Sequence, residues 1–164
     1  MINKIKQNVF QLYFKQFGST TYVIKLRNKN IIIDTSAKEN EEELISDLNE
    51  LNIPPENVDT IILTHNHWDH VGNNDIFKSA KILNCKNKKE IESLSPNIKI
   101  IDAKGHTQTD ICILYDDILF SGDVIFHDGF VGRTDFPESD PKEMEKSLKK
   151  LSKLKYDILC PGHL

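Results

Sequence analysis

Side chains that could bind a metal ion follow four short apolar runs of the sequence. The densest group is the stretch HNHWDH at residues 65–70, which has three histidines and one aspartate among six residues. The other three places are Gly105-His106, Gly122-Asp123 and Gly162-His163, where a glycine comes directly before the ligand-type residue. Glycine lets a chain turn sharply at a strand end and approach an ion. Each place therefore has the form of a strand, a tight turn and a ligand.

Together these places offer five imidazoles and two carboxylates. Such donors suit zinc, and also iron or manganese, whereas calcium and magnesium prefer oxygen. Seven ligands are too many for one tetrahedral ion and suit two ions bridged by a carboxylate. If the preceding strands share one sheet edge, where active sites of α/β sheets concentrate, the sequence predicts a two-ion centre. Its candidate ligands are His65, His67, Asp69, His70, His106, Asp123 and His163.

The apolar runs must form the elements that position these ligands. β-branched and aromatic runs bounded by turn residues predict strands, and we expect them at 9–14, 21–26, 30–34, 59–63, 81–85, 98–102, 111–115, 118–120 and 158–160. Helical spacing of apolar residues predicts a helix over 39–51 and a short one over 90–94. A last helix should begin after Asp140, with Pro141 at its first position and Glu143 completing a capping box. Strands that alternate with helices indicate a layered α/β fold.

Composition and length bound the class of protein. A chain of 164 residues, 38% hydrophobic and 28% charged, predicts one globular domain over 1–164. A net charge of -4 argues against a nucleic-acid partner without excluding one. No apolar run reaches the ~20 residues of a membrane span, and no signal peptide is visible. Three cysteines without a CxxC pair, Cys85, Cys112 and Cys160, predict buried, reduced thiols in a cytoplasmic protein. A homodimer is left open.

These motifs resemble a known family. HNHWDH matches the HxHxDH signature of the metallo-β-lactamase-fold hydrolases. The motifs around His106, Asp123 and His163 match the later motifs of that family in the same order, and Asp34, after the run 31–33, matches its first aspartate. The resemblance implies an α/β fold, the four-layer αββα sandwich, here in a compact single-domain form, with the site at one edge of the two sheets.

The resemblance also implies roles for the ligands. The first metal ion would be held by His65, His67 and His106, and the second by Asp69, His70 and His163, with Asp123 bridging both. Asp69 would also act in catalysis by orienting the nucleophile, and Asp34 would support the ligands rather than bind an ion. Zinc is the expected metal at both positions, with iron or manganese as alternatives.

Two features resemble one branch of the family. Many zinc β-lactamases have cysteine or serine where this chain has Asp123, whereas a bridging aspartate is similar to glyoxalase II, lactonases and RNases. The segment GRTDF at 132–136 resembles glyoxalase II-like thioesterases and persulfide dioxygenases. Arg133 could receive a substrate carboxylate through its planar fork. Its alternative role is a structural pair with Asp135 that fixes the loop.

The sequence therefore predicts a metal-dependent hydrolase of a small-molecule substrate. A hydroxyacylglutathione-like thioester would be attacked by a hydroxide that bridges the two metals. The alternatives are a mononuclear iron persulfide dioxygenase, and a hydrolase of β-lactams, lactones or RNA phosphodiesters. Because the chain stops at Leu164, we expect no helical C-terminal domain of the glyoxalase II type and a pocket that is open or completed by a partner subunit. The substrate, the native metal and the role of His127 stay open.

Overall fold

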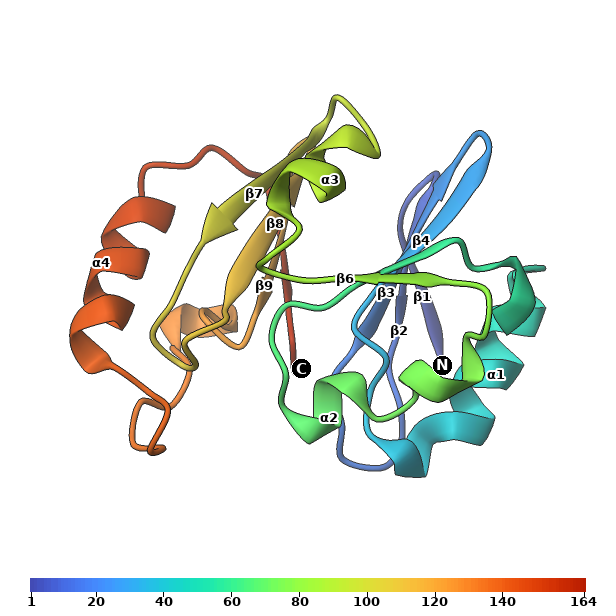
Figure 1. Cartoon of the computed structure of the whole chain (residues 1–164), viewed down its shortest axis with the longest axis horizontal. Helices are drawn as coiled ribbons and strands as arrows, with labels where there is room; N and C mark the ends of the chain where they lie inside the picture. Colours follow the sequence, from blue (N-terminus) through green and yellow to red (C-terminus); the bar gives the residue numbers. More distant parts are fainter. The chain divides into compact units, whose positions relative to one another are not determined.

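The computed structural model describes residues 1–164, which form two compact units, Met1–Leu83 and Asn84–Leu164 (Figure 1). Each unit contains one β-sheet and the helices that connect its strands. No helix in either unit is long and apolar enough to cross a membrane. That one domain spans 1–164 stays a prediction.

The first unit is built on a six-stranded sheet in the order β1-β2-β3-β4-β5-β6. The first four strands form an antiparallel meander, and β4, β5 and β6 pair in parallel. The parallel pairs need crossover connections, which α1 (Glu41–Glu50) and α2 (Trp68–Val71) supply. The strands are β1 (Ile2–Lys6), β2 (Val9–Leu12), β3 (Thr21–Leu26), β4 (Lys29–Ile33), β5 (Thr60–Ile62) and β6 (Lys81–Leu83).

The second unit is built on a four-stranded sheet in the order β10-β9-β8-β7. The neighbours β7, β8 and β9 are antiparallel, whereas β9 and β10 are parallel and joined through α4 (Pro141–Leu151). A short helix, α3 (Lys88–Ser93), precedes β7. The strands are β7 (Ile98–Asp102), β8 (Ile111–Tyr115), β9 (Ile118–Gly122) and β10 (Ile158–Pro161).

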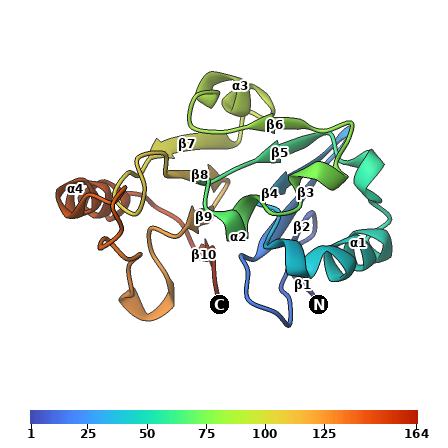
Figure 2. The ribbon, with the colours of Figure 1, turned by 60° about the horizontal axis from the view of Figure 1, so that its bottom comes forward.

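In each unit one helix covers a face of the sheet, as Figure 2 shows for α1 and α4. Leu44 and Leu48 of α1 are fully buried and pack on strand residues that include Val23 and Ile32. Met144 and Leu151 of α4 pack in the same way on the second sheet. Burial of a leucine-sized side chain contributes about 1.5–3 kcal/mol, so each amphipathic helix is held by its apolar stripe.

The three cysteines form no disulfide bond. Cys112 and Cys160 are buried, and Cys112 belongs to the core beneath α4. Burial in this apolar setting raises the pKa of the Cys112 thiol far above its usual value. Cys85 is half-buried. The predicted burial is thus confirmed for Cys112 and Cys160 and wrong for Cys85, which lies outside both strands and helices between β6 and α3.

The sequence located most elements within two residues of their ends, but it missed β1. The strand Ile2–Lys6 reads INKIK, and its polar and charged residues hide the β pattern because it is an edge strand with little burial. The expected first helix starts later than position 39, since Lys38–Asn40 forms a 3-10 turn before α1. The strand expected over 81–85 ends at Leu83. The short helix α2 was also missed, since only a strand end and a tight turn were expected at 65–70. The other expected strands and helices are confirmed.

Parallel pairing brings the ligand-bearing strand ends together within each unit. In the first unit β4 and β5 are parallel, so Asp34 and the 65–70 stretch follow strand ends at one edge. In the second unit β7, β9 and β10 all run the same way, because β7 and β9 are both antiparallel to β8. The carboxyl ends of these three strands lead to His106, Asp123 and His163.

The predicted cap of α4 provides a stability test. The Asp140 carboxylate accepts hydrogen bonds from the backbone amides of Lys142 and Glu143, at 2.9 and 3.2 Å. Replacing Asp140 with alanine should lower the free energy of unfolding by about 1 kcal/mol, because an N-cap side chain satisfies amides that the helix leaves without partners. Chemical denaturation measures the change. Glu145→Ala, in an exposed position of the same helix, serves as the control, and an unchanged midpoint for Asp140→Ala would contradict the assignment.

Candidate metal centre

In the first unit the HNHWDH stretch follows β5 and runs into α2. His67 is the N-cap of α2, and Asp69 and His70 lie within this helix. The ring centroid of His65 lies 4.7 Å from that of His67 and 4.1 Å from that of His70. His65, Asp69 and His70 are buried although all three are polar. The structure therefore gathers all four candidate ligands of this unit in one cluster.

Asp34 fixes the protonation of two of these histidines. One oxygen of Asp34 accepts a hydrogen bond from the Thr64 amide at 2.8 Å, and the other accepts from the Thr64 hydroxyl at 2.7 Å. That second oxygen also lies 2.7 Å from His70 Nδ1. A carboxylate only accepts, so His70 carries its proton on Nδ1. The Thr64 hydroxyl has spent its proton on Asp34, so at 3.1 Å from His65 Nδ1 it accepts from that ring. In both rings Nε2 is then the nitrogen that could bind a metal ion.

The loop that carries Asp34 is held in an unusual backbone conformation. Asp34 and Ser36 have φ values of 56° and 59°, a region that costs energy for residues other than glycine. Asn73 stabilises the loop, since its side-chain amide donates to the carbonyls of Thr35 and Ala37 at 2.7 and 2.8 Å. Sequence reasoning missed Asn73. Its position three residues after the HNHWDH stretch was the only available signal, and an asparagine there also suits an ordinary turn.

In the second unit two predicted ligands, His106 and His163, lie near one carboxylate oxygen of the third, Asp123. His106 Nε2 lies 3.6 Å from Asp123 Oδ2, and His163 Nε2 lies 3.4 Å from the same oxygen. Two ligands that share a tetrahedral zinc ion, each about 2.1 Å from it, lie roughly 3.4 Å apart. The separations fit a carboxylate that shares one ion with each imidazole. The donor set of this unit thus fits the metal that the sequence predicts.

His106 is also held by its own turn. The Asp110 carboxylate accepts hydrogen bonds from the amide and the hydroxyl of Thr107, both at 2.6 Å. Ser139 donates its hydroxyl proton to the His106 carbonyl at 2.6 Å. Burial raises the pKa of Asp110, and the hydrogen bonds from Thr107 act in the opposite direction. The turn is therefore fixed on both sides of the ligand.

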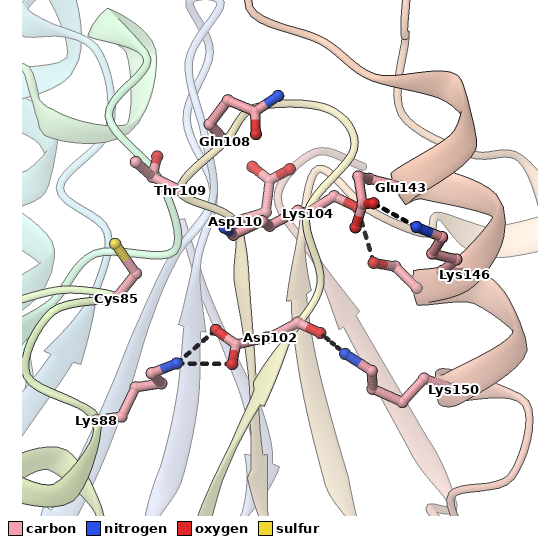
Figure 3. A pocket seen from close by; sticks show the side chains of 11 residues that line it. Cys85, Lys88, Asp102, Lys104, Gln108, Thr109, Asp110, Glu143, Lys146 and Lys150 are labelled. Carbon is pink, nitrogen blue, oxygen red and sulfur yellow. Dashed lines mark hydrogen bonds and ion pairs between the residues drawn. The ribbon is translucent and has the colours of Figure 1, made fainter.

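A polar pocket of about 480 Å³, lined in part by Asp110, lies within this unit (Figure 3). Its charges are largely paired: Lys88 binds both oxygens of Asp102, and Lys150 donates to the Asp102 carbonyl. The pocket has no histidine in its lining, and its residues contribute to none of the groups of candidate metal ligands. Its walls come from α3, the end of β7, the loop before β8 and α4. Besides the residues already named, the lining consists of Cys85, Lys104, Gln108, Thr109, Glu143, Lys146 and Ser147.

A smaller hollow of about 310 Å³ lies beside His163. Two phenylalanines, Phe126 and Phe130, give it an apolar wall, and His127 contributes an imidazole. Phe130 is 71% exposed. Asp128 and Leu164 complete the lining. His127 is thus placed beside a predicted ligand, in a hollow that could receive an apolar group.

Comparison with known proteins supports the family resemblance. The family model described as the metallo-beta-lactamase superfamily matches residues 15–84 and 87–163. A probable metallo-hydrolase of Methanocaldococcus jannaschii is 34% identical over 145 residues, which cover 81% of this chain and 70% of that protein. The structure of a subclass B3 metallo-beta-lactamase of Bradyrhizobium japonicum matches with a TM-score of 0.75 at 15% sequence identity. The match covers 99% of this chain and 77% of that protein's chain. The predicted fold class is confirmed.

A further relative is a hydroxyacylglutathione hydrolase of Hydrogenovibrio crunogenus. It is 31% identical to this chain over 124 residues, which cover 65% of this chain. The chain spans only 45% of the length of that enzyme.

Proposed function

The chain belongs to the metallo-beta-lactamase superfamily, a family of metal-dependent hydrolases, and we propose that it hydrolyses a small thioester at a centre of two metal ions. The centre would draw on both groups of ligands. One ion would be held by His65, His67 and His106, and the other by Asp69, His70 and His163, with Asp123 as the bridge. This assignment rests on the order of the motifs in the family and on the donors that each unit gathers.

The observation that carries the proposal is the arrangement around Asp123. One of its oxygens faces Nε2 of both His106 and His163, at separations that suit ligands of shared ions. A carboxylate with an imidazole on either side is the expected form of a bridging ligand between two ions. Zinc suits this mixed nitrogen and oxygen set, and iron or manganese suits it as well.

Neighbouring residues set the protonation state of the candidate histidine ligands. Asp34 holds the proton of His70 on Nδ1, and Thr64 does the same for His65, so both imidazoles present Nε2. Bound ions of this kind lower the pKa of water towards ~7 and polarise a carbonyl group. Asp69, buried beside His70, would accept a hydrogen bond from the attacking water and orient it towards the substrate carbonyl. No serine or cysteine nucleophile is required.

A thioester is the favoured substrate class for two reasons. Relatives named hydroxyacylglutathione hydrolases match the chain, and the chain contains the GRTDF segment, which resembles thioesterases of that kind. The apolar hollow of Phe126 and Phe130 beside His163 would receive the acyl or thiol part of such a small molecule.

The test begins with protein stripped of metal by a strong chelator and reloaded with zinc, manganese or iron(II). We expect two ions per chain and recovery of thioester hydrolysis on reloading. His67→Ala and His106→Ala should each remove the same ion, so that the double variant binds no less metal than either single one. Additive losses would show that the two histidines do not share an ion.

A substrate panel separates the proposal from its rivals. It contains a thioester, a lactone, a β-lactam, a persulfide and an RNA, each assayed with protein of measured metal content. One iron per chain with oxygen uptake on the persulfide would identify a dioxygenase and overturn the proposal. Preferential turnover of the lactone, the β-lactam or the RNA would agree with a hydrolase but would contradict the proposal that its substrate is a thioester.

A further inference from the structure

The segment Gly132–Phe136, which reads GRTDF, contacts the predicted ligand His106 through its backbone. The carbonyl oxygen of Arg133 lies 2.8 Å from His106 Nδ1. A carbonyl oxygen only accepts hydrogen bonds, so His106 must carry its proton on Nδ1. The opposite nitrogen, Nε2, faces Asp123. The backbone of this segment therefore sets the tautomer that metal binding requires.

The side chains of the same segment fix the orientation of the His106 ring. The ring of Phe136 meets the His106 ring edge-to-face, with centroids 5.7 Å apart and an interplanar angle of 79°. The guanidinium carbon of Arg133 lies 4.7 Å from the centroid of the Phe136 ring. Edge-to-face pairs and cation–π contacts of this kind are attractive and favour one relative orientation of the two groups. Arg133, Phe136 and His106 thus form a continuous row of contacts, from the guanidinium through the Phe136 ring to the imidazole.

Asp135 holds Arg133 in place. Nε and one terminal nitrogen of Arg133 donate to the two oxygens of Asp135, at 2.9 and 2.7 Å. Exposed ion pairs are usually weak, but a bidentate arginine–carboxylate pair with good geometry is the exception. The Arg133 guanidinium lowers the pKa of the Asp135 carboxyl, which stays ionised across the neutral range. The edge of the fork that best fits a carboxylate is therefore already occupied by the protein's own.

We propose that Arg133 is a positioning residue, which braces Phe136 against His106, and that it does not receive a carboxylate of the substrate. The inference rests on the proposed function only in taking His106 as a metal ligand. It also widens the range of thioesters that the site could accept, since a substrate would not need a carboxylate to pair with Arg133. Of the two roles that the sequence leaves open for Arg133, the pair with Asp135 is the one present in the structure.

The experiment measures zinc affinity by competition with a chromogenic chelator, without any substrate. Arg133→Ala and Asp135→Ala should each weaken the binding of one ion by about tenfold, the lower end of the range for residues that support ligands. The double variant should lose no more than either single one, because the two side chains act as a unit. Phe136→Leu should weaken the binding of the same ion. Arg133→Lys should bind zinc more tightly than Arg133→Ala, because lysine keeps a positive charge over the Phe136 ring.

The matched control is another exposed ion pair of the same unit. Lys149 and Glu145 on α4 are joined at 2.6 Å and are 72% and 67% exposed, close to the 68% and 65% of Arg133 and Asp135. Glu145→Ala and Lys149→Ala should leave zinc affinity unchanged. Equal losses in this pair would mean that a general surface effect, rather than positioning, explains the results for Arg133.

Kinetics with two thioesters supply the second readout. A hydroxyacylglutathione carries carboxylates, and the thioester of an acyl group with N-acetylcysteamine carries none. Arg133→Ala should change KM by the same factor for both. A KM raised more than tenfold for the glutathione thioester alone, with wild-type zinc affinity, would overturn the inference and assign Arg133 to the substrate. If His106→Ala binds zinc as the wild type does, it is the proposed function that fails.

Discussion

Gly132→Ala is expected to cost the protein its metal affinity and at least a hundredfold of its activity. A Cβ atom at this position would lie 1.8 Å from the carbonyl oxygen of Asp123 and 3.4 Å from His106 Cβ. The first contact is with backbone, which cannot turn aside as a side chain can. The backbone segments around Gly132 and Asp123 must therefore move apart. This movement carries the Arg133 carbonyl away from His106 and shifts the Asp123 carboxylate. Overpacking of this kind also destabilises the fold by about 2–3 kcal/mol.

Gly129→Ala is the matched control on the same loop. A Cβ at Gly129 would meet nothing within 4 Å, although its φ of 80° carries a cost of about 1–2 kcal/mol for alanine. Zinc competition and chemical denaturation of both variants separate the effects. Gly132→Ala should lose zinc, and Gly129→Ala should keep it with only a small loss of stability. A Gly132→Ala protein with wild-type zinc affinity would show that the close approach to Asp123 does not position the ligand.

The second large effect is expected at Asp34. Asp34→Ala removes the acceptor of three hydrogen bonds in a site that is only 2% exposed. It leaves the His70 Nδ1 proton and the Thr64 amide in the interior without their acceptor, and each such loss costs about 1–3 kcal/mol. Removing a partner of a ligating histidine lowers metal affinity by about 10–100-fold. We therefore expect Asp34→Ala to lose several kcal/mol of stability and most of its zinc.

Asp34→Asn separates the backbone from the carboxylate. Asparagine tolerates the left-handed conformation at φ 56°, so this variant should fold while its amide still pairs poorly with His70. Asp116 is the control, because it has φ 53° in an exposed turn. Asp116→Asn should change neither stability nor zinc affinity. If Asp34→Asn binds zinc as tightly as Asp116→Asn does, then the carboxylate does not orient His70.

The elements with strong local signals were predictable from the sequence. The run 98–102 and the run 111–115 were predicted with the bounds that the structure shows, because β-branched residues and flanking turns mark both ends. The start of α4 was predictable for the same reason, since Asp140 and Pro141 define it locally. By contrast, β1 lacks a buried face of its own, and its pairing with β2 is a long-range fact that periodicity does not contain.

The predicted site residues show the same division. Histidines and aspartates at strand ends stand out by residue type and spacing, so the clusters of candidate ligands in each unit were predictable, while their binding of metal ions stays a prediction. The groups that orient them were not all visible, because their role depends on backbone geometry. The Arg133 carbonyl acts on His106 through an atom that every residue possesses. Gly132 matters through the close approach of Asp123, and Asn73 through two carbonyls of a distant loop.

The burial of Cys112 and Cys160 affects how the protein tolerates its proposed chemistry. Thioester hydrolysis releases a thiol, and cells that handle thiols also contain their oxidised forms. Only a thiolate attacks a disulfide, and the raised pKa of Cys112 together with its burial keeps that thiol protonated and out of reach. Cys160 is shielded by burial as well. The half-buried Cys85 is the one cysteine that lacks this shielding.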